Sequence, residues 1–448
     1  MRLTPSRNTG GTRDAAFALF CTFTISYFLH LTARLPVLGA ARFDLLLAGA
    51  TLIAALASGP NLVVAAGEGK GPIGKRLLIL IAYIALTLPF VEWPGSVLTK
   101  GLEPFLKALV FFFFVTRTVD TLAKLKTLTA IFVACQAFRI LEPLYLHLTE
   151  DYWGAFTSLG NFEFMDRLSG SPFDIINPNG LGFLIVMTLP LLHYLIKPTS
   201  VAGKILYAAV AGAFLYTLVL SSSRSAFLAL IVLVLLAIFR SKNRKTYLAV
   251  AVAAGAVSLA LMTDLQRERY VSIFSHDAKG SATAEGRLTG VVEDLEVAMR
   301  RPLFGYGVGN SREANANFRG VDQLSHDLYT EVAQELGFIG LAYFLSIIVA
   351  IVRKCYQTRK AVAAGTHRDE AHIFLDGYGT SLLLVVQVLI VFSFASYGMS
   401  EPYWYFLGGL VTAAAGLAAK LEQPGQAFAL EPERHPRTGR LLRKLSRK

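Results

Sequence analysis

Residues 300–344 read RRPLFGYGVGNSREANANFRGVDQLSHDLYTEVAQELGFIGLAYF, and within them a polar loop runs directly into an apolar helix. The loop is basic and interrupted by glycines, and it carries one histidine, His326. No charged residue follows Glu335 in this stretch, as expected where a helix passes from water into a bilayer. The stretch therefore predicts a membrane helix with polar side chains at its amino end.

The chain is too apolar for a soluble protein. Of its 448 residues, 54% are hydrophobic and only 17% are charged, and a soluble domain could not bury that much apolar surface. A helix needs about 20 apolar residues to cross a bilayer core of roughly 30 Å, and backbone groups in lipid must bond internally. The sequence predicts an all-α, polytopic membrane protein with about twelve spans, near residues 15–33, 43–59, 77–93, 102–116, 126–148, 178–196, 204–221, 225–240, 247–264, 332–352, 374–395 and 403–421.

The positions of the cations predict the orientation of the chain. Alternate loops are rich in Lys and Arg, which marks them as inside loops. The net charge of +12 is explained by these loops and by the tail, so nucleic acid is not indicated as a partner. The basic N-terminus is interpreted as the start of a retained first helix on the inside, with a cleaved signal peptide as the alternative. The inside loops are residues 67–76, 117–126, 197–204, 240–245 and 353–368.

The span pattern predicts a single transmembrane domain over residues 1–421, followed by a basic cytoplasmic tail over residues 422–448. Two outside loops are long, residues 149–177 and 265–331, and long loops in compact proteins usually carry function or are disordered. The second loop contains its own helix at residues 285–300, because apolar side chains recur there at helical spacing. This amphipathic helix is expected to lie on the membrane or on the bundle.

His326 is the first candidate for chemistry. It lies at or just before the first turn of the predicted span at residues 332–352, and Ser325 is expected to cap that helix. The positive end of a helix dipole disfavours an imidazolium, so the histidine should stay neutral near about pH 7 and accept a proton. The neighbouring Asp327 acts in the opposite direction. A capping or interfacial histidine without reactivity is the alternative.

Two arginines are candidates for binding a diphosphate. Arg224 lies in a very short outside turn between two apolar helices, where a charge costs about 2.5–3.5 kcal/mol on insertion scales and usually has a task. A guanidinium binds phosphate oxygens in pairs. Arg287 heads the helix at residues 285–300, and helix amides together with an arginine suit an anion. The alternatives are a snorkelling Arg224 and an ordinary exposed Arg287.

Further polar residues are secondary candidates. Arg139 lies in an apolar span three residues before Glu142, so an ion pair at i, i+3 explains it about as well as a ligand does. Arg167 and Asn179 lie where the 149–177 loop returns to the membrane.

Four charged residues around the histidine complete the set. Arg312 and Arg319 flank the histidine loop and could simply solvate it. Glu331 and Glu335 follow on the same predicted helix, where they could orient the histidine or act as simple helix charges.

Several motifs are absent from the sequence. There is no P-loop, no HExxH and no Cys/His cluster, and Cys21, Cys135 and Cys355 are scattered in or beside apolar spans. Neither a cofactor nor a metal site is therefore predicted. No DxD pair occurs in either long outside loop, so a metal-held nucleotide sugar is not indicated. We expect a donor that carries its own leaving group, such as a lipid diphosphate.

Three stretches in order resemble the O-antigen ligase and polysaccharide polymerase family of bacterial inner membranes. They are SSSRSAFLAL (221–230), GRLTGVVEDLEVAMRRPLFGYGVGN (286–310) and SHDLYTEVAQELGFIGLAYF (325–344). The shared pattern is an arginine after a small-residue turn, then an arginine-headed helix ending in P-L-F-G-x-G, then a histidine-headed helix with E-x-G-x-x-G. One departure is visible, because the family commonly has His-Asn where this chain has His326-Asp327.

The resemblance implies a GT-C-like glycosyltransferase of the bacterial inner membrane, with a periplasmic active site and cytoplasmic termini. An undecaprenyl-diphosphate-linked glycan would be the donor, and Arg224 and Arg287 would hold its diphosphate. His326 would take the proton from an acceptor hydroxyl, with inversion at the anomeric carbon. The acceptor would be lipid A–core for a ligase, or a lipid-linked glycan for a polymerase. Membrane lipids would surround the protein, and no cofactor is implied.

A transporter or flippase for lipid-linked sugars is the alternative from another class. Transporters often show internal repeats and charges near the middle of the membrane. This sequence shows no internal repeat, and its notable charges cluster in outside loops.

Overall fold

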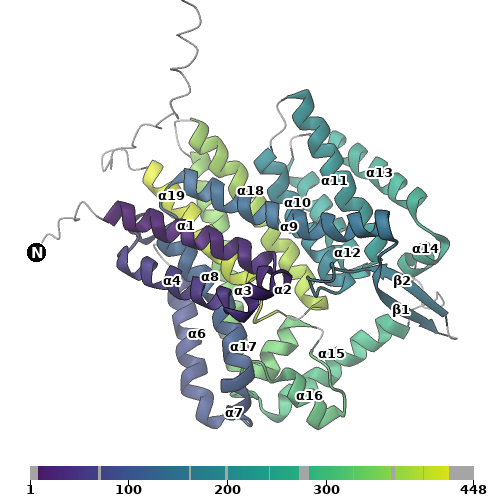
Figure 1. Cartoon of the computed structure of the whole chain (residues 1–448), viewed down its shortest axis with the longest axis horizontal. Coiled ribbons are helices and arrows are strands. Elements are labelled where there is room, and N and C mark those ends of the chain that lie inside the picture. The colour runs from purple at the N-terminus through teal and green to yellow at the C-terminus, as the bar shows by residue number, and fades with distance from the viewer. Residues whose placement is uncertain are drawn as a thin grey trace, which may run out of the picture.

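The computed structural model describes residues 9–68, 72–160, 163–196, 200–241, 243–271, 282–325, 327–364, 369–396 and 398–422. Most of these residues are helical, and one two-stranded hairpin is attached at the edge of the helical bundle (Figure 1). The twelve predicted apolar segments all fall largely within helices. These are α1 (Thr9–Phe28), α4 (Phe43–Ala57), α6 (Ile73–Thr87), α8 (Leu102–Thr118), α9 (Leu122–Glu150), α10 (Pro178–Ile196), α11 (Val201–Ser221), α12 (Arg224–Arg240), α13 (Arg244–Leu261), α17 (Leu328–Ala364), α18 (Glu370–Phe392) and α19 (Tyr403–Leu421).

Seven helical segments of the described chain are long and apolar enough to cross a membrane. The helical membrane class predicted from composition is therefore confirmed, whereas a total of twelve spans stays a prediction. The qualifying segments are Ile73–Phe90, Leu122–Glu150, Pro178–Leu195, Val201–Ser221, Leu328–Ala363, Glu370–Ala395 and Tyr403–Leu421.

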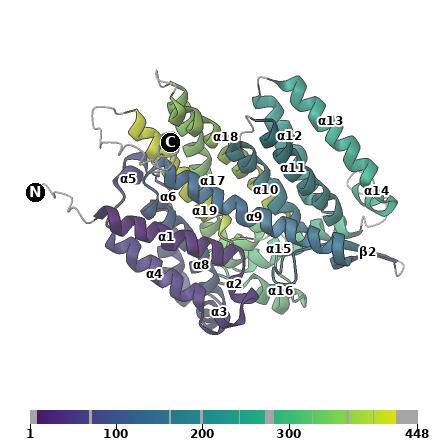
Figure 2. The ribbon, with the colours of Figure 1, turned by 45° about the horizontal axis from the view of Figure 1, so that its top comes forward.

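Short helices connect or flank the long ones. Figure 2 shows α11, α12 and α13 side by side at one side of the bundle, away from α1 and α4. The remaining helices are α2 (Leu31–Arg34), α3 (Pro36–Ala40), α5 (Leu62–Glu68), α7 (Pro94–Ser96), α14 (Asp264–Val271), the longer α15 (Ala282–Arg300) and α16 (Ser311–Arg319), with single turns at Leu88–Phe90, Val97–Gly101 and Ser393–Ala395.

The core of the bundle lies around α19. Of the candidate spans, α19 is the most deeply buried in the bundle, and it packs against α5, α8 and α17. Phe406 of α19 contacts the rings of Phe28, Phe111 and Phe132. Aromatic rings from four helices thus interlock there, which holds the first and last helices of the bundle together.

The helix α17 bends at Gly337, which has φ 68° and ψ 179°. A Cβ at this position would lie 2.4 Å from the carbonyl oxygen of Leu303, so only glycine fits. The bend lets the preceding loop pair with α17 through backbone bonds. The amide of Tyr306 donates to Gln334, and the amide of Phe338 donates to Pro302, both over 2.8 Å. The P-L-F-G-x-G turn at residues 302–307 therefore binds directly to the E-x-G bend at residues 335–337 of α17.

The loop at residues 149–177, which the sequence predicts to be outside, is not purely irregular. It contains an antiparallel hairpin of β1 (Gly154–Gly160) and β2 (Glu163–Leu168), in which Ala155 pairs with Arg167. Phe156 and Phe164 are exposed on one face, while Met165 and Arg167 are buried on the other. The prediction of an all-α protein missed this hairpin, because its alternation of side chains is short and interrupted by Gly and Asp.

The predicted amphipathic helix at residues 285–300 is present as α15. Among the residues whose side chains are described, Asp294, Val297 and Ala298 are buried, and α15 packs against α16 and α17 (Figure 1). Val292, Leu295 and Met299 of the expected apolar face remain exposed. The helix therefore lies on the bundle through one face and keeps an apolar stripe on its surface.

Candidate functional site

A turn of serines separates α11 from α12 and places Arg224 at the start of α12. Ser222 adopts φ 48°, and its amide donates to the carbonyl of Val219. Ser223 then caps α12, because its hydroxyl accepts a hydrogen bond from the amide of Ala226. Arg224 follows as the first residue of the helix and is buried. The turn thus brings a guanidinium group to the amino end of a helix, where the dipole also favours an anion.

Two more arginines converge on this turn from other parts of the chain. Arg167 of β2 donates through Nε to the carbonyl oxygen of Ser221 over 2.9 Å. Arg269 of α14 donates through Nε to the carbonyl oxygen of Ser222 over 2.9 Å. The residues Arg167, Arg224 and Arg269 are only 7%, 8% and 4% exposed. These three buried arginines form what is here called the arginine cluster.

The amino end of α10 also meets the arginine cluster. Asn179 accepts a hydrogen bond from Nη2 of Arg167 over 3.0 Å and another from the hydroxyl of Ser223 over 3.1 Å. A Cβ on Gly182 would lie only 2.6 Å from that of Ala226, so α10 and α12 approach closely here because residue 182 is a glycine. The amino ends of two helices therefore flank the arginine cluster. Both favour negative charge nearby.

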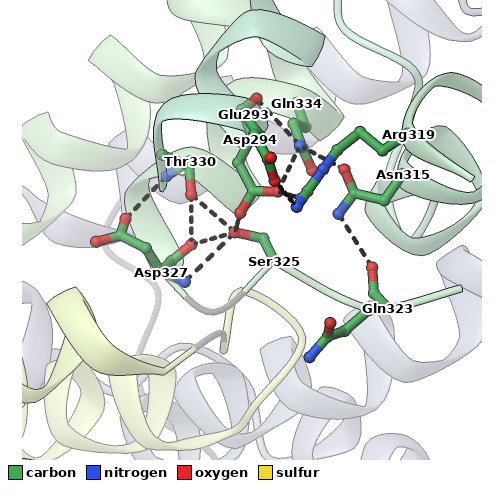
Figure 3. Close-up of polar contacts among 9 residues, drawn as sticks. All are labelled: Glu293, Asp294, Asn315, Arg319, Gln323, Ser325, Asp327, Thr330 and Gln334. Atoms are coloured by element: carbon green, nitrogen blue, oxygen red, sulfur yellow. Dashed lines mark hydrogen bonds and ion pairs between the residues drawn. The ribbon is translucent and has the colours of Figure 1, made fainter. Parts of the chain in front are cut away.

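A second polar network surrounds Asp294 of α15 and includes Ser325 and Asp327, the two sequence neighbours of His326 (Figure 3). Arg319 donates to Asp294 over 2.7 Å and also pairs with Glu293. Ser325 donates its hydroxyl proton to Asp294 over 2.7 Å, and Gln334 donates to the backbone carbonyl of Asp294 over 3.1 Å. Arg319 does more than solvate the loop, because this network ties α15, α16 and the approach to α17 together.

The cap of α17 is Asp327 rather than Ser325, so the predicted cap is wrong by two residues. The Asp327 carboxylate accepts hydrogen bonds from the amides of Tyr329 and Thr330 over 2.8 and 3.0 Å. Ser325 is turned toward Asp294 instead. Burial raises the pKa of Asp327, and the bonds from the two amides oppose that effect. Asp was overlooked as the cap because Ser and Asp are almost equally common there.

Glu331 and Glu335 of α17 connect this helix to other segments through hydrogen bonds. Glu331 accepts hydrogen bonds from the amides of Gly398 and Met399 over 2.7 and 3.2 Å. Glu335 accepts one from the amide of Ser311 over 3.4 Å. Both glutamates are buried, so the interpretation as simple helix charges is wrong. Their possible action on His326 stays a prediction.

Two predicted site groups lie outside the described residues. His326 falls between the described ranges, and the side chain of Arg287 is also outside them, although its backbone belongs to α15. The convergence of Arg224, Arg287 and His326 therefore stays a prediction. Arg312 pairs with Asp322 over 2.6 and 2.7 Å at the exposed surface, so its described contact is structural.

The predicted ion pair between Arg139 and Glu142 is wrong. Arg139 instead grips Asp174 through Nε and Nη2 over 2.5 and 2.9 Å. Glu142 is held by both terminal nitrogens of Arg34. Arg139 and Glu142 are therefore each paired with a residue on another segment through two parallel hydrogen bonds. A pair at i, i+3 on one helix seldom offers this geometry.

Asp174 also contacts His30, which no sequence pattern singled out. Nε2 of His30 lies 3.2 Å from Oδ1 of Asp174. Burial alone would raise the pKa of Asp174, but hydrogen bonds from His30 and Arg139 outweigh it and lower the pKa to about 2. The carboxylate therefore stays ionised and holds both partners.

Arg269 was also missed by the sequence analysis, because it lies in the charged run QRERY and looks like part of a solvated helix face. Arg167 and Asn179, which were secondary candidates, prove to bind each other and the serine turn that precedes Arg224. Across the described ranges, no group of three or more His, Cys, Asp or Glu side chains is placed to hold a metal ion.

Part of the chain matches a known protein family. The family model described as O-Antigen ligase matches residues 209–345, a range that contains all three stretches on which the resemblance rests. This segment is similar to the O-antigen ligase family, which confirms the resemblance. The match supports glycosyl transfer of the ligase or polymerase type by a membrane protein. No curated protein matches the chain.

Proposed function

We propose that this protein is an O-antigen ligase-like membrane glycosyltransferase, which moves a glycan from undecaprenyl diphosphate to a sugar hydroxyl of lipid A–core. The arginine cluster is the observation that carries the proposal. Arg167, Arg224 and Arg269 are buried around one turn, at the amino ends of α10 and α12. An anion with several oxygens suits such a place best, and a diphosphate is an anion of this kind.

In the proposed reaction, His326 takes the proton from the acceptor hydroxyl, and the oxygen forms a bond to the anomeric carbon. The bond from that carbon to the diphosphate oxygen breaks, and its electron pair leaves with undecaprenyl diphosphate. Attack from the side opposite the leaving group inverts the anomeric carbon.

Arg224 and Arg287 bind the diphosphate in this proposal and stabilise the negative charge that develops on it. Arg167 and Arg269 donate to carbonyls of the serine turn, so they position Arg224 and add positive charge beside it. The charge is assigned to arginines rather than to a metal because both long outside loops lack a DxD pair.

The proposal places this chemistry at the periplasmic face of the bacterial inner membrane. All members of the arginine cluster belong to segments that the pattern of cations predicts to be outside. The termini, including the basic tail at residues 422–448, are then cytoplasmic, and residues 1–421 form one transmembrane domain.

The decisive experiment compares two arginines at opposite ends of one helix. Purified protein in nanodiscs is given undecaprenyl-diphosphate-linked glycan and lipid A–core, and transfer is followed by gel. Arg224→Ala should lower transfer by about 100-fold. Arg240, the last residue of α12, donates to the hydroxyl of Tyr356 over 3.4 Å, and Arg240→Ala should leave transfer unchanged. Equal activity of both variants would contradict the proposed diphosphate site.

The same assay separates a ligase from a polymerase. A ligase attaches glycan to lipid A–core and forms no product when that acceptor is withheld. A polymerase lengthens the lipid-linked glycan in the absence of lipid A–core. Chain growth without lipid A–core would replace the ligase assignment by the polymerase one.

A further inference from the structure

A second polar site is built around His30, at the connection between α1 and α2. His30 adopts φ 51° and ψ 46°, a left-handed conformation that is uncommon for a residue with a side chain. Its Nε2 faces Asp174, and no hydrogen bond from the described residues reaches its Nδ1. The side chain is 40% exposed. The imidazole is therefore fixed at one nitrogen and open at the other.

The groups behind His30 are rigid. Asp174 has a side chain that is only 1% exposed, and it is held by both nitrogens of the Arg139 fork. Arg139 also donates to the side chain of Gln136 over 3.1 Å and to the hydroxyl of Tyr403 over 3.2 Å. A backbone bond of 2.9 Å from the amide of Gly170 closes the small loop that carries Asp174. The imidazole is consequently held in one orientation.

Glu401 supplies a carboxylate beside this group. It is exposed, and within the described residues no hydrogen bond or ion pair is made by its carboxylate. Tyr403, two residues after Glu401, accepts a hydrogen bond from Arg139 over 3.2 Å, which brings the segment that carries Glu401 to the group of Arg139, Asp174 and His30. The loop that carries it is fixed, because the amide of Glu401 donates to Gly398 over 3.1 Å.

Two segments connect this second site to the proposed reaction centre. The segment from Arg167 to Asn179 is anchored at the arginine cluster at both ends and carries Asp174 in its middle. The loop at residues 398–401 binds Glu331 of α17, the helix that begins just after His326. The second site therefore belongs to the same end of the bundle as the candidate reaction centre.

We propose that His30 and Glu401 bind sugar hydroxyl groups of a glycan substrate. A sugar hydroxyl both donates and accepts hydrogen bonds, and this pair offers a carboxylate acceptor next to an imidazole that can donate or accept. A site built for hydroxyl groups discriminates strongly, because its polar atoms lose their partners when the hydroxyl is missing. The inference rests on the proposed function, since it takes the substrate to be a glycan.

The strained backbone of His30 makes a clean test possible. Glycine adopts the left-handed region without penalty, so His30→Gly removes the imidazole while it relaxes the backbone. Arg42 provides the matched control, because it is exposed and adopts almost the same conformation, with φ 47° and ψ 46°. Arg42→Gly should change neither binding nor transfer, and both variants should melt at or above the wild-type temperature.

The experiment measures binding and transfer separately in nanodiscs. The two probes are lipid A–core and undecaprenyl-diphosphate-linked glycan, and the variants are His30→Gly and Glu401→Gln. We expect each variant to weaken the binding of one probe by about tenfold or more, with kcat less affected than KM. Weaker binding of lipid A–core identifies the acceptor glycan as the ligand, whereas weaker binding of the other probe identifies the donor glycan.

Two results would overturn the inference. One is that His30→Gly and Glu401→Gln both keep the wild-type thermal stability and both bind the two probes as tightly as the wild type does. The other is a loss of binding that Arg42→Gly shows equally. The proposed function fails in a different way, namely when wild-type protein binds the probes but transfers no glycan, or when Arg224→Ala transfers normally.

Discussion

Arg167 and Arg269 donate hydrogen bonds to one and the same atom, the carbonyl oxygen of Ser222, over 3.5 and 2.9 Å. One arginine comes from a hairpin and the other from a short helix, so two segments distant in sequence are fixed to the turn that carries Arg224. Such an arrangement concentrates positive charge in a place from which water is largely excluded, and there an anionic ligand interacts most strongly.

Arg269→Ala should weaken glycan transfer by about tenfold or more, because a charge-assisted hydrogen bond and a positive charge are both lost from the arginine cluster. The measurement is kcat/KM for the lipid-linked donor. Arg267→Ala is the control, since Arg267 lies on the same short helix with an exposed side chain that binds Leu259 and Asp264. An Arg269 variant as active as the Arg267 variant would remove Arg269 from the site.

His326→Ala should reduce transfer by about 100-fold or more, because general-base catalysis is lost. Binding of the lipid-linked donor should be unchanged, which separates a catalytic defect from a folding defect. Normal transfer by this variant would reject His326 as the base.

Arg287→Lys should impair transfer although the charge is kept, because one ammonium group cannot reproduce the two parallel bonds of a guanidinium fork. Donor KM is the quantity to follow, with Arg300→Lys at the other end of α15 as the control. Full activity of Arg287→Lys would show that this residue does not grip the diphosphate.

Gly337→Ala should lower the free energy of unfolding by about 1–3 kcal/mol, because the left-handed φ and the contact with Leu303 both exclude a Cβ. Gly290→Ala is the matched change in a helix with nothing within 4 Å of the added atom, and it should be neutral or slightly stabilising. Thermal melting in detergent distinguishes the two. A tolerant Gly337 would mean that the bend is not required for the pairing between the loop and α17.

Asp174→Ala should destabilise the fold by about 3 kcal/mol or more, because it leaves the buried Arg139 without its carboxylate. The pKa of Asp174 is lowered from 3.8 to about 2, so the stability from this pair is complete above the unfolded-state value and is lost as the pH falls toward 2. Asp322→Ala breaks the exposed pair with Arg312 and should leave the melting temperature unchanged. Equal effects of the two substitutions would contradict a buried pair at Asp174.

Much of the fold could be predicted because each membrane helix has its own recognisable run of apolar residues. The apolar segments fall in helices, and the amphipathic pattern at residues 285–300 corresponds to α15. Hydrophobic length and periodicity are properties of a single segment, so no knowledge of its neighbours is needed. The hairpin at β1 and β2 was missed because strand pairing depends on two segments that meet, and each is too short to be recognised alone.

The partners of the charged side chains could not be predicted. An ion pair between Arg139 and Glu142 on the same helix was one of two interpretations of Arg139, but Arg139 binds Asp174 on another segment. Arg269 looked like an ordinary surface charge, yet it is buried against Ser222. In both cases the choice depends on which distant segment offers the better hydrogen-bond geometry, and sequence spacing carries no information about it.

The helical membrane class, Arg224 and the motifs that match the O-antigen ligase family can all be recognised in the amino-acid sequence. Only the folded chain reveals that Arg167 and Arg269 join Arg224, that Asp327 caps α17, and that His30 lies against Asp174. The two kinds of feature differ in how far apart in the sequence the interacting residues lie. Hydrophobic burial in a bilayer acts on each segment separately, whereas a buried ion pair or hydrogen bond requires atoms from distant segments within about 3 Å of each other.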